Sequence, residues 1–128
     1  RDGTFYHGRT TCGSPITAAA ALAVCDAFAE DEVLAKAAPV MDALARGFER
    51  LARLPGIHRT ATLGMASAIE IAEAAGGAAR AQACAKAALD RGLFIRPLGN
   101  VLYLWPPLTT TEDELALMLE RLEDALRA

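Results

Sequence analysis

Two amphipathic stripes, far apart in the chain, constrain its fold most. Each places apolar residues three and four positions apart, which is the pattern of one helix face. The second stripe follows Thr111 and Glu114, which are spaced as a capping box at a helix start. The sequence therefore predicts two amphipathic helices. Their apolar positions are Leu34, Ala37, Met41, Leu44, Phe48 and Leu51 in the first and Leu115, Met118, Leu119, Leu122 and Leu126 in the second.

Proline limits how the first stripe, over residues 32–54, is built. Pro39 lies inside it, and proline inside a helix removes a hydrogen bond and clashes with the preceding turn. The alternatives are a kink at Pro39 or a short helix that ends there while a new one begins. Pro55 and Gly56 then end the helix.

Short runs rich in β-branched and apolar residues lie between the two stripes. Residues 57–62 and 65–71, separated by Leu63 and Gly64, predict two strands or one bulged strand. Residues 94–96 and 101–105 flank a turn over residues 98–100, which predicts a β-hairpin.

The remaining segments complete a mixed fold. Residues 1–15 contain glycine and proline without periodicity and predict a loop, whereas the alanine-rich residues 17–28 predict a buried helix. Residues 76–91 predict another helix, with Gly92 in the position of a left-handed C-cap. The order of these elements predicts a two-layer α+β fold with helices packed on one face of a small sheet.

Charge and cysteine content exclude several classes of protein. The net charge of −3 and the pI near 5.3 offer no cationic surface for nucleic acid or for anionic lipid. The apolar stretches are shorter than the roughly 18 residues of a transmembrane helix. The three cysteines, Cys12, Cys25 and Cys84, have neither a disulfide nor a metal-site spacing, so we expect no metal, buried thiols at 25 and 84, and a reducing, cytoplasmic location.

The loop before the first helix is a candidate anion site. Its glycines allow backbone N–H groups to approach a phosphate, and the Thr10 hydroxyl adds a donor. The alternative is a polar turn in which Ser14 or Thr17 caps the helix. No nucleophile is patterned around His7, so the sequence predicts no catalytic residue there.

Arg96 is a candidate ligand for a carboxylate. It ends an apolar strand just before Pro97, where a guanidinium is costly unless it meets an anion. Its planar fork suits a carboxylate held through two hydrogen bonds. The alternative is an edge-strand arginine paired with one of the domain's own acids. The only lysines, Lys36 and Lys86, fall on solvated helix faces and are not candidates for a Schiff base.

Two segments resemble the class III pyridoxal-phosphate aminotransferases. They are residues 7–15, HGRTTCGSP, followed by the alanine-rich residues 18–23, and residues 92–107, GLFIRPLGNVLYLWPP. The second segment is most similar to the biotin-pathway branch of the family. The resemblance covers essentially the whole chain but only the C-terminal part of such an enzyme. It implies a loop over residues 1–15 at the cofactor phosphate and the dimer interface, and the small C-terminal domain of a fold-type I aminotransferase over 16–128.

The resemblance also implies roles for individual residues. Thr10 would donate its hydroxyl to the phosphate of pyridoxal 5'-phosphate, assisted by the backbone of Arg9 and Thr10. Gly8 would lie beside the substrate, and Arg96 would hold the substrate carboxylate. The family's loop crosses into a neighbouring subunit, which implies a homodimer. Three positions depart from the family pattern: Arg9 in place of proline, Ser14 in place of asparagine, and Trp105, which we assign to packing, in place of methionine.

The implied reaction transfers an amino group from S-adenosylmethionine to 8-amino-7-oxononanoate, giving 7,8-diaminononanoate. The Schiff-base lysine of the family lies upstream of the loop, so this segment alone is expected to be inactive. One alternative is a class III aminotransferase for an ornithine-like, γ-amino or diamine substrate. Another is a non-catalytic remnant domain. Arg96 and residues 103–107 favour the biotin-pathway branch over the other aminotransferases.

Overall fold

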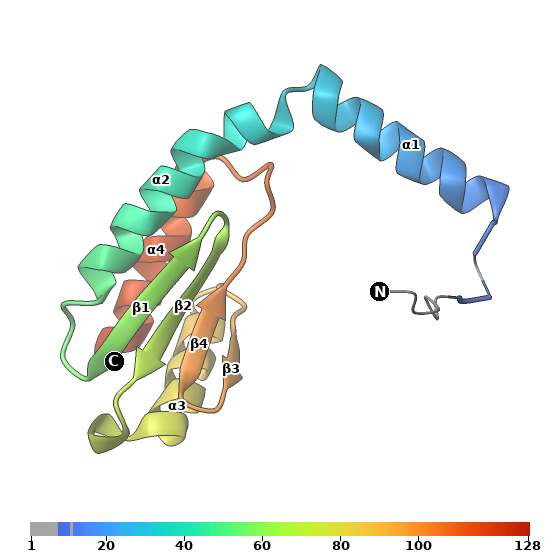
Figure 1. Cartoon of the computed structure of the whole chain (residues 1–128). Coiled ribbons are helices and arrows are strands. Elements are labelled where there is room, and N and C mark those ends of the chain that lie inside the picture. The colour runs from blue at the N-terminus through green and yellow to red at the C-terminus, as the bar shows by residue number, and fades with distance from the viewer. Residues whose placement is uncertain (1–7, 11) are drawn as a thin grey trace, which may run out of the picture. The chain divides into compact units, whose positions relative to one another are not determined.

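The chain forms two compact units, residues 1–33 and 34–128 (Figure 1). The computed structural model describes residues 8–10 and 12–128. Within the described part, the first unit holds helix α1 (Pro15–Glu30), and the other helices and the sheet follow it in the chain. The predicted division into a loop over residues 1–15 and a domain over 16–128 concerns function and stays a prediction.

The sheet has four antiparallel strands: β1 (Ile57–Leu63), β2 (Ala66–Ile71), β3 (Arg96–Leu98) and β4 (Val101–Leu104). Their spatial order is β1-β2-β4-β3, so the two hairpins lie side by side and β2 pairs with β4. Residues 57–71 thus form two strands and not one. The predicted strand over 94–96 is wrong in both bounds, because pairing with β4 runs from Arg96 to Leu98.

Both hairpins close through two-residue turns that begin with glycine. Leu63 pairs with Ala66 and Leu98 pairs with Val101, which leaves two residues in each connection. Gly64 and Gly99 both have a φ of +58°. A positive φ at the first turn residue matches the right-handed twist of the strands and is readily available only to glycine. The hairpin predicted around residues 98–100 is confirmed.

Three helices cover one face of this sheet: α2 (Val33–Leu51), α3 (Gly77–Asp90) and α4 (Glu112–Arg127) (Figure 1). A short 3-10 helix, Glu73–Ala75, leads into α3. Side chains alternate between buried and less buried along β2 and β4, as expected for a sheet covered on one side. The predicted two-layer α+β fold is confirmed. The largest fully buried side chains are Phe48, Leu44, Ile69, Ile71, Leu102, Leu115 and Leu122.

Helix α2 runs through Pro39 without ending there. Pro39 itself is exposed, whereas Ala37 and Val40 beside it are buried, so burial of the apolar face holds the helix together across the missing hydrogen bond. Further along, Gly47 faces α4: a Cβ at this position would lie 2.5 Å from Leu119 Cδ1. Glycine therefore allows close packing of α2 against α4.

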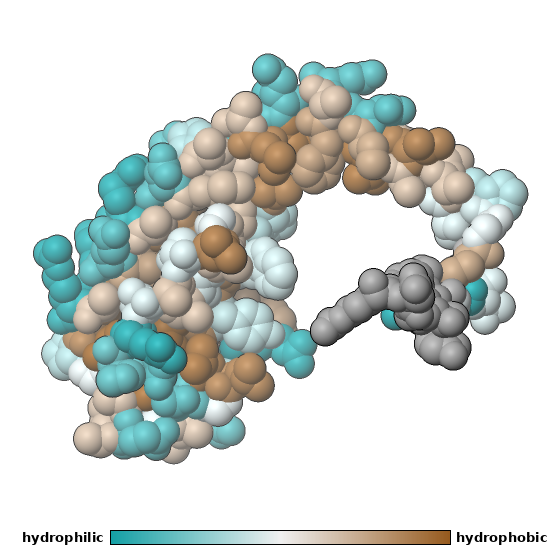
Figure 2. Space-filling model, viewed as in Figure 1, coloured by the Kyte–Doolittle hydropathy of each residue, from teal (hydrophilic) through white to brown (hydrophobic). Residues whose placement is uncertain are grey.

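Helix α1 forms as predicted, but none of its residues is buried within the described chain. Its run of alanines and the proline in its first turn favour a helix by propensity alone. The expectation of a buried helix, and of a buried Cys25, is wrong for this chain because the described residues provide no second layer against α1. Large apolar side chains remain exposed along it (Figure 2), namely Ile16, Leu22, Val24 and Phe28.

Candidate functional site

Arg96 lines a hollow of about 470 Å³ beside the β3–β4 hairpin. The strand β3 fixes its backbone, and its side chain is exposed opposite Tyr103 of β4. The wall is mainly apolar and aromatic. It includes residues from the segment before β3, the end of β4 and helix α4, chiefly Phe94, Tyr103, Trp105, Pro106, Leu117 and Met118.

The charge of Arg96 has no acidic partner among the residues that the structure describes. Glu114 lines the same hollow, but its carboxylate accepts hydrogen bonds from the backbone N–H of Thr111 at 2.9 Å and from the Thr111 hydroxyl at 3.0 Å. The bond from the backbone N–H has the larger effect and the bond from the hydroxyl the smaller one. Together they hold the pKa of Glu114 below its usual range. Glu114 thus completes the predicted capping box. The alternative of an Arg96 ion pair with one of the domain's acids is not observed among residues 8–10 and 12–128.

A second guanidinium adds positive charge to this hollow. Arg121 of α4 donates from Nη1 to the carbonyl oxygen of Gly92 at 3.1 Å, which fixes it at the end of α3. The hollow therefore has excess positive charge, because Arg96 and Arg121 line it together with a single carboxylate among the described residues, that of Glu114. An apolar wall with one exposed guanidinium suits a molecule that has an aliphatic body and a carboxylate end.

A second hollow of about 520 Å³ lies on the uncovered face of the sheet. Its floor is made of small residues of β1 and β2, among them Ala61, Ala66 and Ala68. It shares Tyr103, Leu104 and Trp105 with the Arg96 hollow. The two hollows therefore adjoin each other along the end of β4.

Trp105 does not pack into the core, contrary to our expectation, since it is 75% exposed. Phe94, for which the sequence predicts no role, is 72% exposed and lines the Arg96 hollow. A signal for Trp105 was present in the sequence. Alternation along a strand puts positions 103 and 105 on the face opposite to the buried residues at 102 and 104.

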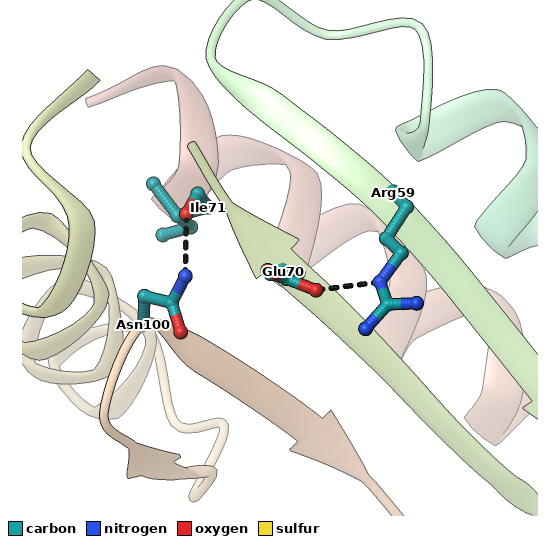
Figure 3. A network of polar contacts seen from close by, with 4 residues as sticks. All are labelled: Arg59, Glu70, Ile71 and Asn100. Carbon is teal, nitrogen blue, oxygen red and sulfur yellow. Dashed lines mark hydrogen bonds and ion pairs between the residues drawn. The ribbon is translucent and has the colours of Figure 1, made fainter. Parts of the chain in front are cut away.

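The other end of the uncovered sheet face is polar (Figure 3). Arg59 Nε donates to Glu70 Oε2 at 2.5 Å between the paired strands β1 and β2, and this bond lowers the pKa of Glu70. Nearby, Asn100 Nδ2 donates to the carbonyl oxygen of Ile71 at 3.0 Å. Arg59 is therefore paired, which distinguishes it from Arg96 on the same sheet.

Gly8, Arg9 and Thr10 belong to the first unit and are exposed. The backbone closes a turn in which the Cys12 N–H donates to the Arg9 carbonyl at 2.9 Å, while the Arg9 N–H donates to Cys12 Sγ at 3.1 Å. The Arg9 N–H is therefore occupied. Of the groups assigned to the phosphate, this leaves the Thr10 hydroxyl and the Thr10 backbone N–H, and the exposed Arg9 side chain adds a cation beside them. His7 and Thr11 lie outside the described residues.

The donors of this turn fit an anionic group such as a phosphate. Within the described part of the chain, neither the Thr10 hydroxyl nor the Arg9 guanidinium makes a hydrogen bond, and a Cβ at Gly8 would meet no atom within 4 Å. The alternative of a helix cap holds only in part. The Ser14 side chain makes no cap hydrogen bond to α1, whereas the Thr17 hydroxyl donates to the Ser14 carbonyl at 3.0 Å.

Comparison with known proteins decides the family. The model of the family described as aminotransferase class-III matches residues 2–126. The chain belongs to the class III aminotransferases. This confirms the family resemblance, but the roles assigned to Gly8, Arg9, Thr10 and Arg96 stay predictions.

Relatives of this class III chain differ in their named activities. The adenosylmethionine-8-amino-7-oxononanoate aminotransferase of Synechococcus elongatus is 35% identical over 98% of this chain, which covers 30% of that protein. The omega-aminotransferase of Caulobacter vibrioides is 30% identical over 94% of this chain, which covers 28% of that protein. The chain thus spans less than a third of these relatives.

Solved structures share the fold of this class III segment. A PLP-bound aminotransferase mutant from Vibrio fluvialis superposes with a TM-score of 0.84 at 27% identity, over 96% of this chain and 29% of that one. The comparisons therefore indicate pyridoxal phosphate as the cofactor of the family segment. No helix in the described ranges is long and apolar enough to cross a membrane.

Proposed function

We propose that this chain is the C-terminal part of a pyridoxal-phosphate aminotransferase of the biotin pathway. The full-length enzyme would transfer the amino group of S-adenosylmethionine to 8-amino-7-oxononanoate and act as a homodimer in the cytoplasm. The observation that carries this proposal is Arg96, exposed without an acidic partner among the described residues in an apolar, aromatic hollow. The relatives named for this reaction support it.

Each end of the segment would supply one binding function. The Thr10 hydroxyl and the Arg9 guanidinium would hold the cofactor phosphate, with Gly8 beside the substrate, and the neighbouring subunit would present this loop to the site. Arg96 would grip the far carboxylate of the keto acid through two parallel hydrogen bonds. A carboxylate fixed on a rigid strand limits the positions that the reacting ketone can occupy.

Pyridoxal phosphate, when bound, supplies the electron sink and carries the amino group between the two substrates. The chain itself contributes binding and orientation. Lys36 and Lys86 are both exposed on helices, so we expect the segment alone to have no transaminase activity. The Schiff-base lysine would come from the rest of the full-length enzyme.

The test uses the full-length enzyme loaded with pyridoxal phosphate. S-adenosylmethionine alone should change the visible absorbance of the cofactor, and 8-amino-7-oxononanoate should restore it. Arg96→Ala should raise KM for the keto acid far more than KM for the amino donor. The role proposed for Arg96 is to hold the carboxylate at the far end of the keto acid, whereas the carboxylate of S-adenosylmethionine lies next to the amino group that is transferred. Equal effects on both KM values would contradict the role of Arg96.

A second candidate is an aminotransferase for an ornithine-like, γ-amino or diamine substrate. The Caulobacter omega-aminotransferase is nearly as similar to this chain as the biotin-pathway relatives are. An absorbance change with ornithine or a diamine, and none with S-adenosylmethionine, would favour this candidate. The third possibility, a non-catalytic remnant, requires that no full-length enzyme with a Schiff-base lysine exists.

A further inference from the structure

Trp105 lies where the two hollows of the sheet domain meet. Three residues line both hollows, and they differ in how much of their surface is available. Leu104 is 6% exposed, Tyr103 is 37% exposed and Trp105 is 75% exposed. Trp105 thus offers the largest apolar surface at the junction, and an indole ring can bury a large area against an aliphatic chain.

A continuous path joins Arg96 to the hollow on the uncovered sheet face. Arg96 pairs with Tyr103 across β3 and β4, and Tyr103 pairs with Ala68 across β4 and β2. The three residues form one row across the sheet, on the same face. Ala68 and Tyr103 line the hollow on the uncovered face, and Trp105, which directly follows β4, lines it as well.

We propose that Trp105 selects the carboxylic acids of this site by the length of their aliphatic chain. An acid whose carboxylate is held by Arg96 lays its methylene groups against the indole ring at the junction of the hollows. Each methylene removed from water adds to the affinity, so long-chain acids bind more tightly than short ones. This inference takes one point from the proposed function, namely that Arg96 binds the carboxylate.

The experiment measures binding and not catalysis. The full-length enzyme loaded with pyridoxal phosphate is titrated by calorimetry with straight-chain saturated acids from butanoate to nonanoate, which have no ketone to react. For the wild type, we expect the affinity to rise by roughly twofold to fourfold for each added methylene. Trp105→Ala should reduce this increment to less than about twofold and leave the affinity for butanoate unchanged.

Three further variants separate the roles. Trp105→Phe keeps an aromatic wall and should keep most of the chain-length increment. Arg96→Ala should weaken all the acids by a similar factor, because it removes the carboxylate ligand. Leu98→Ala is the matched control, since Leu98 is 73% exposed on the adjacent strand and lines neither hollow.

The proposal would be overturned if Trp105→Ala kept the wild-type gain in affinity per methylene. It would also be overturned if Trp105→Ala lowered the affinities for butanoate and nonanoate by the same factor. Absence of any chain-length dependence in the wild type would overturn it too. Failure of the proposed function would give a different result. No amino group would be transferred from S-adenosylmethionine to 8-amino-7-oxononanoate, but the affinity for the acids would still rise with each methylene, and this rise would still depend on Trp105.

Discussion

Helices α1 and α2 follow each other in the chain and are stabilised in different ways. α1 is rich in alanine and has no buried residue in the described chain, so its helix depends on local propensity. α2 contains Pro39, which disfavours a helix, yet it forms because six of its residues are buried in the sheet domain. Burial thus outweighs a strong local breaker, whereas α1 has only its own backbone to support it.

The largest expected effect tests this difference directly. Phe48→Ala in α2 removes a side chain that is 1% exposed and should lower the free energy of unfolding by about 3–5 kcal/mol. Leu22→Ala in α1, where the side chain is 65% exposed, should change it by less than about 0.5 kcal/mol. Urea unfolding of the 128-residue chain measures both. Similar losses would show that α1 belongs to the same cooperative core.

The segment before α1 is expected to contribute to binding and not to stability. In the full-length enzyme, Thr10→Ala should weaken cofactor retention by roughly 1.5–3 kcal/mol, as expected for the loss of a hydrogen bond to a charged group. Equilibrium dialysis against pyridoxal phosphate gives the affinity. Thr17→Ala is the control, because that hydroxyl is already donated to the Ser14 carbonyl. Equal cofactor affinity in wild type and Thr10→Ala would refute the assignment.

The N-termini of α1 and α4 extend the comparison to capping. Thr111→Ala removes a hydroxyl that accepts from the Glu114 N–H at 3.3 Å and should destabilise the sheet domain by about 1 kcal/mol. Ser14→Ala should change stability by only a few tenths of a kcal/mol, because the Ser14 side chain makes no cap hydrogen bond. Thermal unfolding of the two variants is compared with wild type. A larger effect at Ser14 would contradict the structure of this helix start.

The smallest effect concerns the surface pair of Arg59 and Glu70. Because the Arg59 hydrogen bond lowers the folded pKa of Glu70 below 4.5, its stabilisation is present above that pH and is lost as the pH falls through the folded pKa. Arg59→Gln should therefore lower the Tm slightly at neutral pH, and the difference should vanish in acid. Arg53→Gln, at another exposed arginine, is the control. A difference that persists at low pH would show that packing, not charge, accounts for the Arg59 effect.

Local chemistry explains which predictions were confirmed. The capping box at Thr111 and the glycine turn at Gly99 depend on groups within three residues of each other, so the sequence contains the whole interaction. Pro39 and Trp105 were harder to interpret. A helix across Pro39 needs the buried face of α2, and the exposure of Trp105 depends on which face of β4 the helices leave uncovered.

The candidate site divides in the same way. From the sequence, Thr10 and Arg96 are predicted site residues. Thr10 offers a hydroxyl donor in a glycine-rich loop, and Arg96 is a charged residue at the end of an apolar strand. It missed Phe94 and the junction at Trp105, since a hollow is made by residues brought together from β3, β4 and α4.

The sequence by itself determined the type and order of the helices and strands, the turn at Gly99, the capped last helix and the family, because each depends on short-range spacing or on motifs read in order. Only the tertiary structure decided which face of the sheet stays uncovered, that Arg96 lacks an acidic partner among the described residues, and that α1 has no cover within them. These properties depend on distances between residues far apart in the chain, and hydrophobic periodicity does not specify such distances.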